Sequence, residues 1–159
     1  VVALFNFTDA PRSFDVSMES LGLDPEKTYT AFEFWNGSWE GVVKGGIGCE
    51  IPMRTGRLFA LWEAADHPQF VGNDRHLTQG AVELNDLKWD GNAKTYTLEV
   101  KAIGGFPFTY FVRVPEGYEF KGASAPKGGK VSASIRNDGL LAVTVSAPSS
   151  QDVAVKLQF

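Results

Sequence analysis

The chain has 159 residues and a formal net charge of −4, with 43% hydrophobic and 21% charged residues. This is an ordinary balance for a globular protein, and the length suits one large β-domain or two small ones. No apolar run approaches the ~20 residues of a membrane-spanning helix. The basic residues form no stripe, so the composition argues against both a membrane and a nucleic acid as partners.

Cysteine and histidine are scarce. The single cysteine, Cys49, excludes an internal disulfide and a multi-thiolate metal site. Two histidines, His67 and His76, are too few for most histidine-based metal centres. We therefore expect no metal and no cofactor. The opening Val-Val-Ala-Leu-Phe is typical of a core strand and not of a signal peptide, so we expect a longer parent polypeptide.

The first half of the chain predicts short strands. Residues 1–7 are apolar at nearly every position, which is typical of a strand buried on both faces. The apolar positions change parity between Ala31 and Phe32, which predicts a β-bulge. Asn36-Gly37 predicts a hairpin turn. The best helix signal is a single turn at Asp24-Pro25-Glu26, where an N-cap residue precedes a proline.

The second half follows a break at residues 64–68, Ala-Ala-Asp-His-Pro. Residues 81–89 predict a strand with a phase shift at Asn85-Asp86, and Gly104-Gly105 and Asn137-Asp138-Gly139 predict turns between alternating strands. The sequence thus predicts an all-β protein with almost no helix, built from two small antiparallel β-sandwich units packed together. We place the domains at 1–65 and 66–159.

Residues 71–80, Val-Gly-Asn-Asp-Arg-His-Leu-Thr-Gln-Gly, interrupt the alternation and collect polar groups. Asp74, Arg75, His76 and Gln79 together could hold a sugar, because vicinal hydroxyls suit bidentate partners. The alternative is structural: Asp74 and Thr78 cap turns while Arg75 and His76 join the two units.

The tryptophans present the same choice. Trp39 and Trp89 stand at the edges of turns and are the candidates for sugar-stacking platforms, although aromatic packing inside the protein is the alternative. No nucleophile elbow or phosphate-binding loop occurs, and Cys49 has no neighbouring histidine in the sequence. We therefore expect no catalytic residue in this chain.

Three segments in order resemble a known family. They are residues 2–9 (Val-Ala-Leu-Phe-Asn-Phe-Thr-Asp), residues 21–37 with Leu-Gly-Leu, Tyr29 and Phe-Trp-Asn-Gly, and residues 71–80. The first two resemble the β-domain that follows the catalytic barrel in α-galactosidase-like glycoside hydrolases. The third is similar to a segment further along in bacterial members, where it leads into a strand like residues 82–89.

This resemblance implies a bacterial parent enzyme that hydrolyses glycosides, plausibly α-galactosides, with its two catalytic aspartates in a barrel of ~250 residues. No residue here matches the barrel motifs, so no catalytic residue is carried over. The expected role is a non-catalytic C-terminal β-sandwich region that braces the barrel of the same polypeptide and contributes to a homo-oligomer of the parent enzyme. A periplasmic or extracellular location is favoured over the cytoplasm.

Two other functions remain open at this point. A carbohydrate-binding module would use the exposed aromatic residues and the cluster from Asp74 to Gln79. A self-contained enzyme would need a cleft with convergent titratable groups. The barrel-bracing role predicts an exposed apolar patch on this chain where the barrel packs. Sugar binding that is lost on Trp39→Ala, Trp89→Ala or Asp74→Ala would indicate the binding module, and hydrolysis of nitrophenyl glycosides by this chain would indicate the enzyme.

Overall fold

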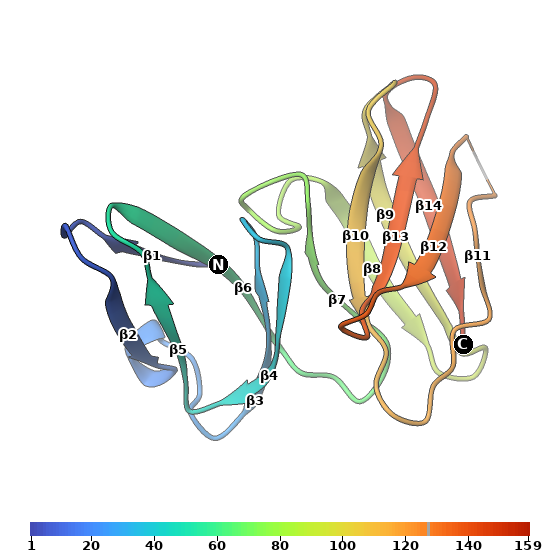
Figure 1. Cartoon of the computed structure of the whole chain (residues 1–159). Coiled ribbons are helices and arrows are strands. Elements are labelled where there is room, and N and C mark those ends of the chain that lie inside the picture. Colours follow the sequence, from blue (N-terminus) through green and yellow to red (C-terminus); the bar gives the residue numbers. More distant parts are fainter. Residues whose placement is uncertain (127) are drawn as a thin grey trace. The chain divides into compact units, whose positions relative to one another are not determined.

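The structure is a computed structural model that describes residues 1–126 and 128–159. It divides into two compact units, Val1–Ala64 and Ala65–Phe159 (Figure 1). The division falls one residue before the boundary expected from the sequence. Each unit has its own set of hydrogen-bonded strands.

The chain is all-β, as predicted, and its strands pair antiparallel throughout. The described part contains one short 3-10 helix, η1 (Glu19–Leu21), and no helix long and apolar enough to cross a bilayer. The strands of the first unit are β1 (Val2–Asn6), β2 (Arg12–Ser17), β3 (Thr28–Glu33), β4 (Ser38–Lys44), β5 (Gly46–Ile51) and β6 (Thr55–Glu63). Those of the second are β7 (Gln69–Asn73), β8 (Leu84–Asp90), β9 (Thr95–Ala102), β10 (Phe108–Arg113), β11 (Gly122–Ser124), β12 (Lys130–Ile135), β13 (Leu141–Ser146) and β14 (Gln151–Gln158).

The first unit is a four-stranded sheet, in the order β1-β6-β3-β4, with the two-stranded ribbon β2-β5 on one face (Figure 1). Alternate residues of each strand point into the space between these two layers. The resulting core contains Met18, Tyr29, Ile47 and Phe59, which are almost fully buried. Apolar side chains such as Val2, Val16 and Cys49 pack around them.

Two expectations for this unit are wrong. β1 is an edge strand whose outward side chains Ala3 and Phe5 are exposed, so it is not buried on both faces. Its continuous apolar run therefore reflects one face in the core and another that this unit leaves uncovered. The residues Asp24-Pro25-Glu26 form a turn in which Glu26 N donates to Asp24 Oδ1 at 2.9 Å. The helical turn lies earlier, in η1.

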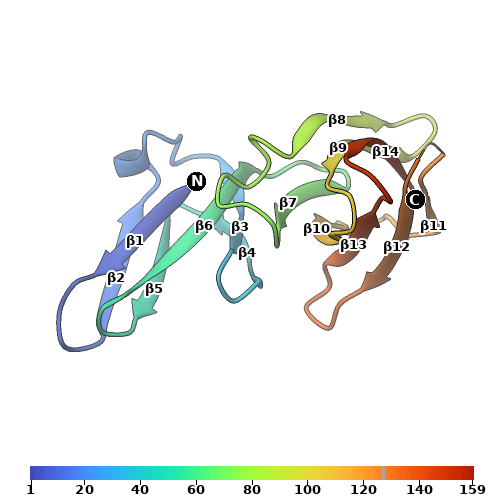
Figure 2. The ribbon, with the colours of Figure 1, turned by 90° about the horizontal axis from the view of Figure 1, so that it is seen from above.

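The second unit is a β-sandwich of two four-stranded sheets, in the orders β12-β13-β10-β7 and β11-β14-β9-β8. Figure 2, viewed from above, shows these two sheets as two layers. Buried and more exposed residues alternate along β9, β13 and β14, as the sequence predicts for the strands of this half. Fully buried side chains from both sheets fill the interior, including Leu98, Tyr110, Val143 and Val155.

The predicted irregularities are confirmed. Register shifts occur between Ala31 and Phe32 in the β3–β4 pairing and between Leu84 and Asp86 in the β8–β9 pairing. Gly105 and Gly139 close turns with φ of 76° and 86°, in the left-handed region that favours glycine. The strand expected at residues 81–89 begins three residues later, because residues 78–83 form turns.

Candidate functional site

The polar segment between β7 and β8 is organised by three buried side chains, Asn73, Gln79 and Glu83. The Asn73 Oδ1 atom accepts hydrogen bonds from the backbone N–H groups of Arg75 (2.8 Å) and His76 (2.9 Å). The Asn73 Nδ2 atom donates to the Glu83 carboxylate, which also accepts from Gly80 N at 2.7 Å. Polar groups buried this way are stable only when they are all paired, so these three residues fix the path of the loop.

Gln79 belongs to this scaffold and does not face a ligand. Its Nε2 atom donates to the carbonyl oxygens of Asn73 (3.1 Å) and His76 (2.8 Å), and its Oε1 atom accepts from Asn73 N at 2.9 Å. The side chain is 1% exposed. Its amide thus does structural work at a position where the sequence suggested sugar binding.

Asp74, Arg75 and His76, in contrast, reach the surface of the same loop. Asp74 Oδ1 accepts a hydrogen bond from Thr109 N, on strand β10, at 2.7 Å. The Arg75 guanidinium carbon lies 4.5 Å from the centre of the Phe108 ring, and its Nη1 atom donates to the Lys101 carbonyl oxygen. The His76 ring is held by its own loop, with Nδ1 at 2.9 Å from Thr78 Oγ1.

A surface depression of about 470 Å³ adjoins Asp74 and Arg75. Its other walls come from the turn that precedes β10 and from the start of that strand, and they include Phe106, which is 69% exposed. Phe106 was not among the residues predicted to bind a ligand, since it alternates with the apolar Phe108 and Tyr110 like the buried face of a strand. The available signal was its position directly after the Gly104-Gly105 turn, where a side chain leaves the sheet.

The two candidate tryptophans lie in different surroundings. Trp89 is half-buried, and its indole stacks on the His67 ring at 5.2 Å with an interplanar angle of 8°. The edges of Tyr118 and Phe159 pack against it at 5.4 and 6.2 Å. Trp89 therefore belongs to an aromatic cluster. Trp39 is half-buried in β4, opposite Phe32, in the other unit from the polar loop.

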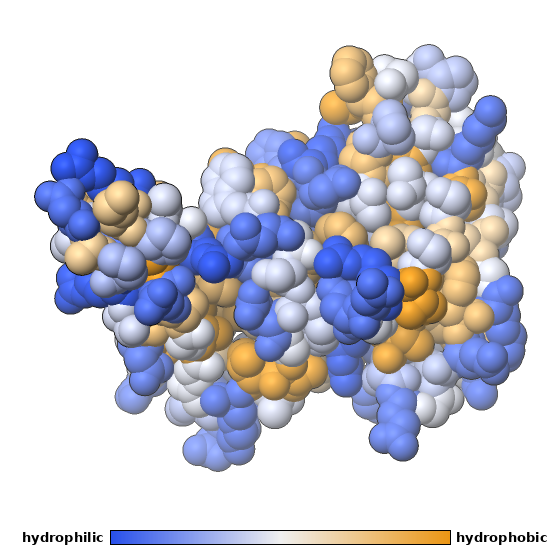
Figure 3. Space-filling view, in the orientation of Figure 1, coloured by the Kyte–Doolittle hydropathy of each residue, from blue (hydrophilic) through white to orange (hydrophobic). Residues whose placement is uncertain are grey.

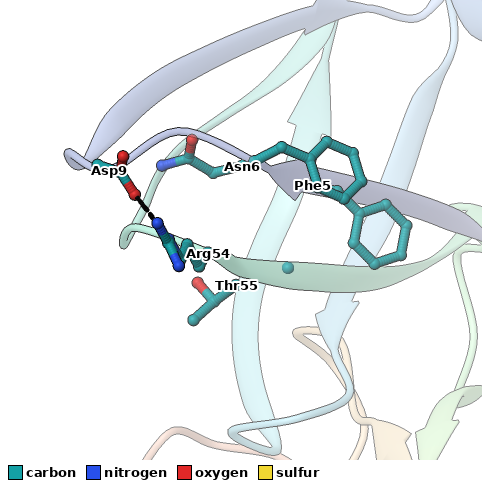
Figure 4. A pocket seen from close by; sticks show the side chains of 7 residues that line it. Phe5, Asn6, Asp9, Arg54 and Thr55 are labelled. Carbon is teal, nitrogen blue, oxygen red and sulfur yellow. Dashed lines mark hydrogen bonds and ion pairs between the residues drawn. The ribbon is translucent and has the colours of Figure 1, made fainter.

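A second depression, of about 500 Å³, lies at the β1 end of the first unit. Figure 4 shows Phe5 at one end of it and the Asp9–Arg54 ion pair at the other, where Arg54 Nε donates to Asp9 Oδ1 at 2.6 Å. The Phe5 and Phe7 rings stack at 5.8 Å with an interplanar angle of 17°. These rings are 57% and 86% exposed.

The buried Asn6 side chain connects the backbone segments around this depression. It is 1% exposed, and its Nδ2 atom donates to the carbonyl oxygens of Ala10, Ile51 and Pro52 at 2.8–3.1 Å. Its Oδ1 atom accepts from Thr8 N at 3.0 Å. The Phe5–Phe7 pair thus stands on a hydrogen-bonded frame that joins β1, the following loop and the end of β5.

Apolar side chains reach the surface on both units (Figure 3). Among residues 1–126 and 128–159, no three histidine, cysteine, aspartate or glutamate residues gather closely enough to hold a metal ion. Burial raises the pKa of the Cys49 thiol, which packs against the core of the first unit. A raised pKa lowers the thiolate fraction and with it the nucleophilicity of a cysteine.

No protein-family model matches the chain, and no curated protein sequence matches it.

Proposed function

We propose that this chain is a non-catalytic β-sandwich region of an α-galactosidase-like glycoside hydrolase and braces the catalytic barrel of the same polypeptide. The observation that carries the proposal is the exposed Phe5–Phe7 pair. Burial of apolar surface in an interface is favourable by about 25 cal/mol for each Å² that is removed from water. Two stacked rings on an exposed edge strand are therefore a favourable surface for a neighbouring domain to cover.

Two further features support the barrel as that neighbour. Phe5 lies on β1 and Phe7 directly follows it, in the segment whose sequence resembles the strand that follows the barrel in the family. The charged groups of Asp9 and Arg54 border the rings, and an apolar centre with a polar rim is the usual composition of an interface.

The first test is to measure the intact mass of the complete native polypeptide. We expect this mass to be well above the 17.3 kDa of this chain, because the polypeptide should also contain a barrel of ~250 residues. In that enzyme, the double change Phe5→Ala and Phe7→Ala should lower the unfolding temperature of the barrel, because the apolar contact is lost. Calorimetry of the parent enzyme measures this effect.

The matched control is Ile135→Ala, which removes an exposed apolar side chain from the second unit and should leave the barrel's unfolding temperature unchanged. The isolated chain should release no nitrophenolate from nitrophenyl α-galactosides. A native polypeptide without a barrel, or equal unfolding temperatures for the double variant and the unmodified enzyme, would refute the proposal.

A further inference from the structure

The depression beside Asp74 and Arg75 combines a carboxylate, a guanidinium and apolar side chains. It is lined by Asp74, Arg75, Ile103, Phe106, Pro107 and Phe108, all in the second unit. Its volume of about 470 Å³ falls within the ~300–1,000 Å³ of small-molecule sites. None of these residues belongs to the Phe5–Phe7 surface, so the inference below does not depend on a catalytic barrel.

Phe106 is presented by a fixed turn. Its N–H donates to Ile103 O at 3.2 Å, and Gly105 N donates to Ala147 O at 3.0 Å. A Cβ atom at Gly104 would lie 2.8 Å from Ser149 Cα, so the turn packs tightly on the neighbouring loop. A large exposed ring on such a turn loses little conformational entropy when a ligand covers it.

Arg75 is also fixed before any ligand arrives. Stacking on Phe108 and the hydrogen bond to Lys101 O hold the guanidinium in place. The guanidinium also faces the Tyr110 hydroxyl. Because a guanidinium has five N–H donors, these contacts leave further donors at the edge of the depression.

Asp74 supplies the matching acceptor. Its Oδ1 atom is engaged by Thr109 N at 2.7 Å, which fixes the orientation of the carboxylate. Its Oδ2 atom accepts no hydrogen bond from the described part of the chain. A carboxylate oxygen and guanidinium N–H groups around one depression can together accept from and donate to neighbouring hydroxyl groups.

We propose that this depression binds a neutral saccharide, with one face of a pyranose ring on Phe106 and adjacent hydroxyl groups on Asp74 and Arg75. The carboxylate opposes an anionic ligand and the guanidinium opposes a cationic one, whereas a polyol uses both. The weakly polar C–H face of a sugar ring suits the electron-rich face of an aromatic side chain. The site uses Asp74 and Arg75 from the predicted cluster and replaces the predicted tryptophan platforms with Phe106.

The test is a titration of the isotopically labelled 159-residue chain, followed by amide NMR shifts. The probes are the methyl glycosides of galactose, glucose and mannose, together with lactose and cellobiose. We expect at least one probe to shift the amides of Asp74, Arg75 and Phe106 with a Kd of about 1 mM. Phe106→Ala should raise the Kd about tenfold, because the lost contact between the aromatic ring and the sugar contributes about that much to the affinity.

Two further variants make the test specific. Asp74→Asn keeps the Oδ1 acceptor for Thr109 and should weaken binding through the loss of charge alone. Phe7→Ala removes a ring that is more exposed but lies in the other unit, and should bind as the unmodified chain does. The inference is wrong if no probe shifts these amides, if Phe106→Ala binds as tightly as the unmodified chain, or if only inorganic sulfate binds there in a salt-dependent way.

Discussion

The Glu33 carboxylate is fully buried in the first unit, where it closes the β3–β4 hairpin. It accepts hydrogen bonds from the backbone N–H groups of Trp35 (3.2 Å), Asn36 (2.8 Å) and Leu58 (3.4 Å). Arg57 Nη1 also lies 3.5 Å from Glu33 Oε2. One side chain thereby pairs the polar groups of the hairpin turn and of the neighbouring strand β6.

Replacing Glu33 by alanine should therefore lower the free energy of unfolding by about 3 kcal/mol, because buried amides lose their acceptor and Arg57 loses its counter-charge. Urea denaturation followed by tryptophan fluorescence measures this change. Glu26→Ala is the control: Glu26 pairs with Lys44 at 3.3 Å with its side chain largely exposed, so its loss should cost less than about 1 kcal/mol. Equal costs for the two variants would contradict this role of Glu33.

Single residues also mark what sequence reasoning could and could not recover. Asp74 and Arg75 were identified as candidates from their chemistry, and the structure places them beside one depression. Gln79 has the same chemistry but points inward. Glu33 and Glu83 stand in the sequence like ordinary polar positions of a strand, and nothing local shows that their partners are backbone amides of a turn.

Strand β5 lies close to its paired strand β2 at one glycine and less close at another. A Cβ atom at Gly46 would lie 2.8 Å from Val16 O in the paired strand β2, whereas one at Gly48 would lie 3.6 Å from Phe14 O. The first distance is a clash with backbone, and the second is ordinary van der Waals contact. Only the first glycine is required by its surroundings.

Gly46→Ala should accordingly destabilise the first unit by about 1–3 kcal/mol through forced displacement of the ribbon. Gly48→Ala should be neutral or slightly stabilising, since alanine restricts the unfolded chain more than glycine does. Thermal unfolding of the two variants side by side measures the difference. A destabilisation by Gly48→Ala as large as that by Gly46→Ala would show that the β2–β5 spacing is not the cause.

At the scale of elements, the hairpins and bulges were predictable because turn residues and alternation are local signals. The position of β1 was not. A run of apolar residues is compatible with a central strand or with an edge strand that has an uncovered face. Only the order β1-β6-β3-β4 shows that β1 is at the edge.

The whole molecule should lose stability in alkali because of tyrosines buried in the second unit. Burial raises the pKa of Tyr96 to about 12, from 10.0, and the hydrogen bond that it accepts from Phe70 N only partly opposes the shift. Burial also raises the pKa of Tyr110, and the positive charge of Arg75 opposes that shift.

The unfolded state therefore loses its tyrosine protons at lower pH than the folded state. The stabilisation is complete below pH 10.0 and is lost as the pH rises towards about 12. Tyr96 alone should lower the free energy of unfolding by about 1.4 kcal/mol per pH unit in that window. Urea denaturation across the window measures the slope, which Tyr96→Phe should reduce. A stability independent of pH there would contradict the burial of both hydroxyl groups.

The sequence by itself determined the fold class, the turns and the bulges, because alternation and turn chemistry act over a few neighbouring residues. It also indicated the segment where polar chemistry gathers. Tertiary structure alone decided which of those polar side chains face outward, that Phe106 joins Asp74 and Arg75, and that Phe5 and Phe7 are exposed. These features depend on which distant segments lie side by side, and no local pattern encodes such contacts.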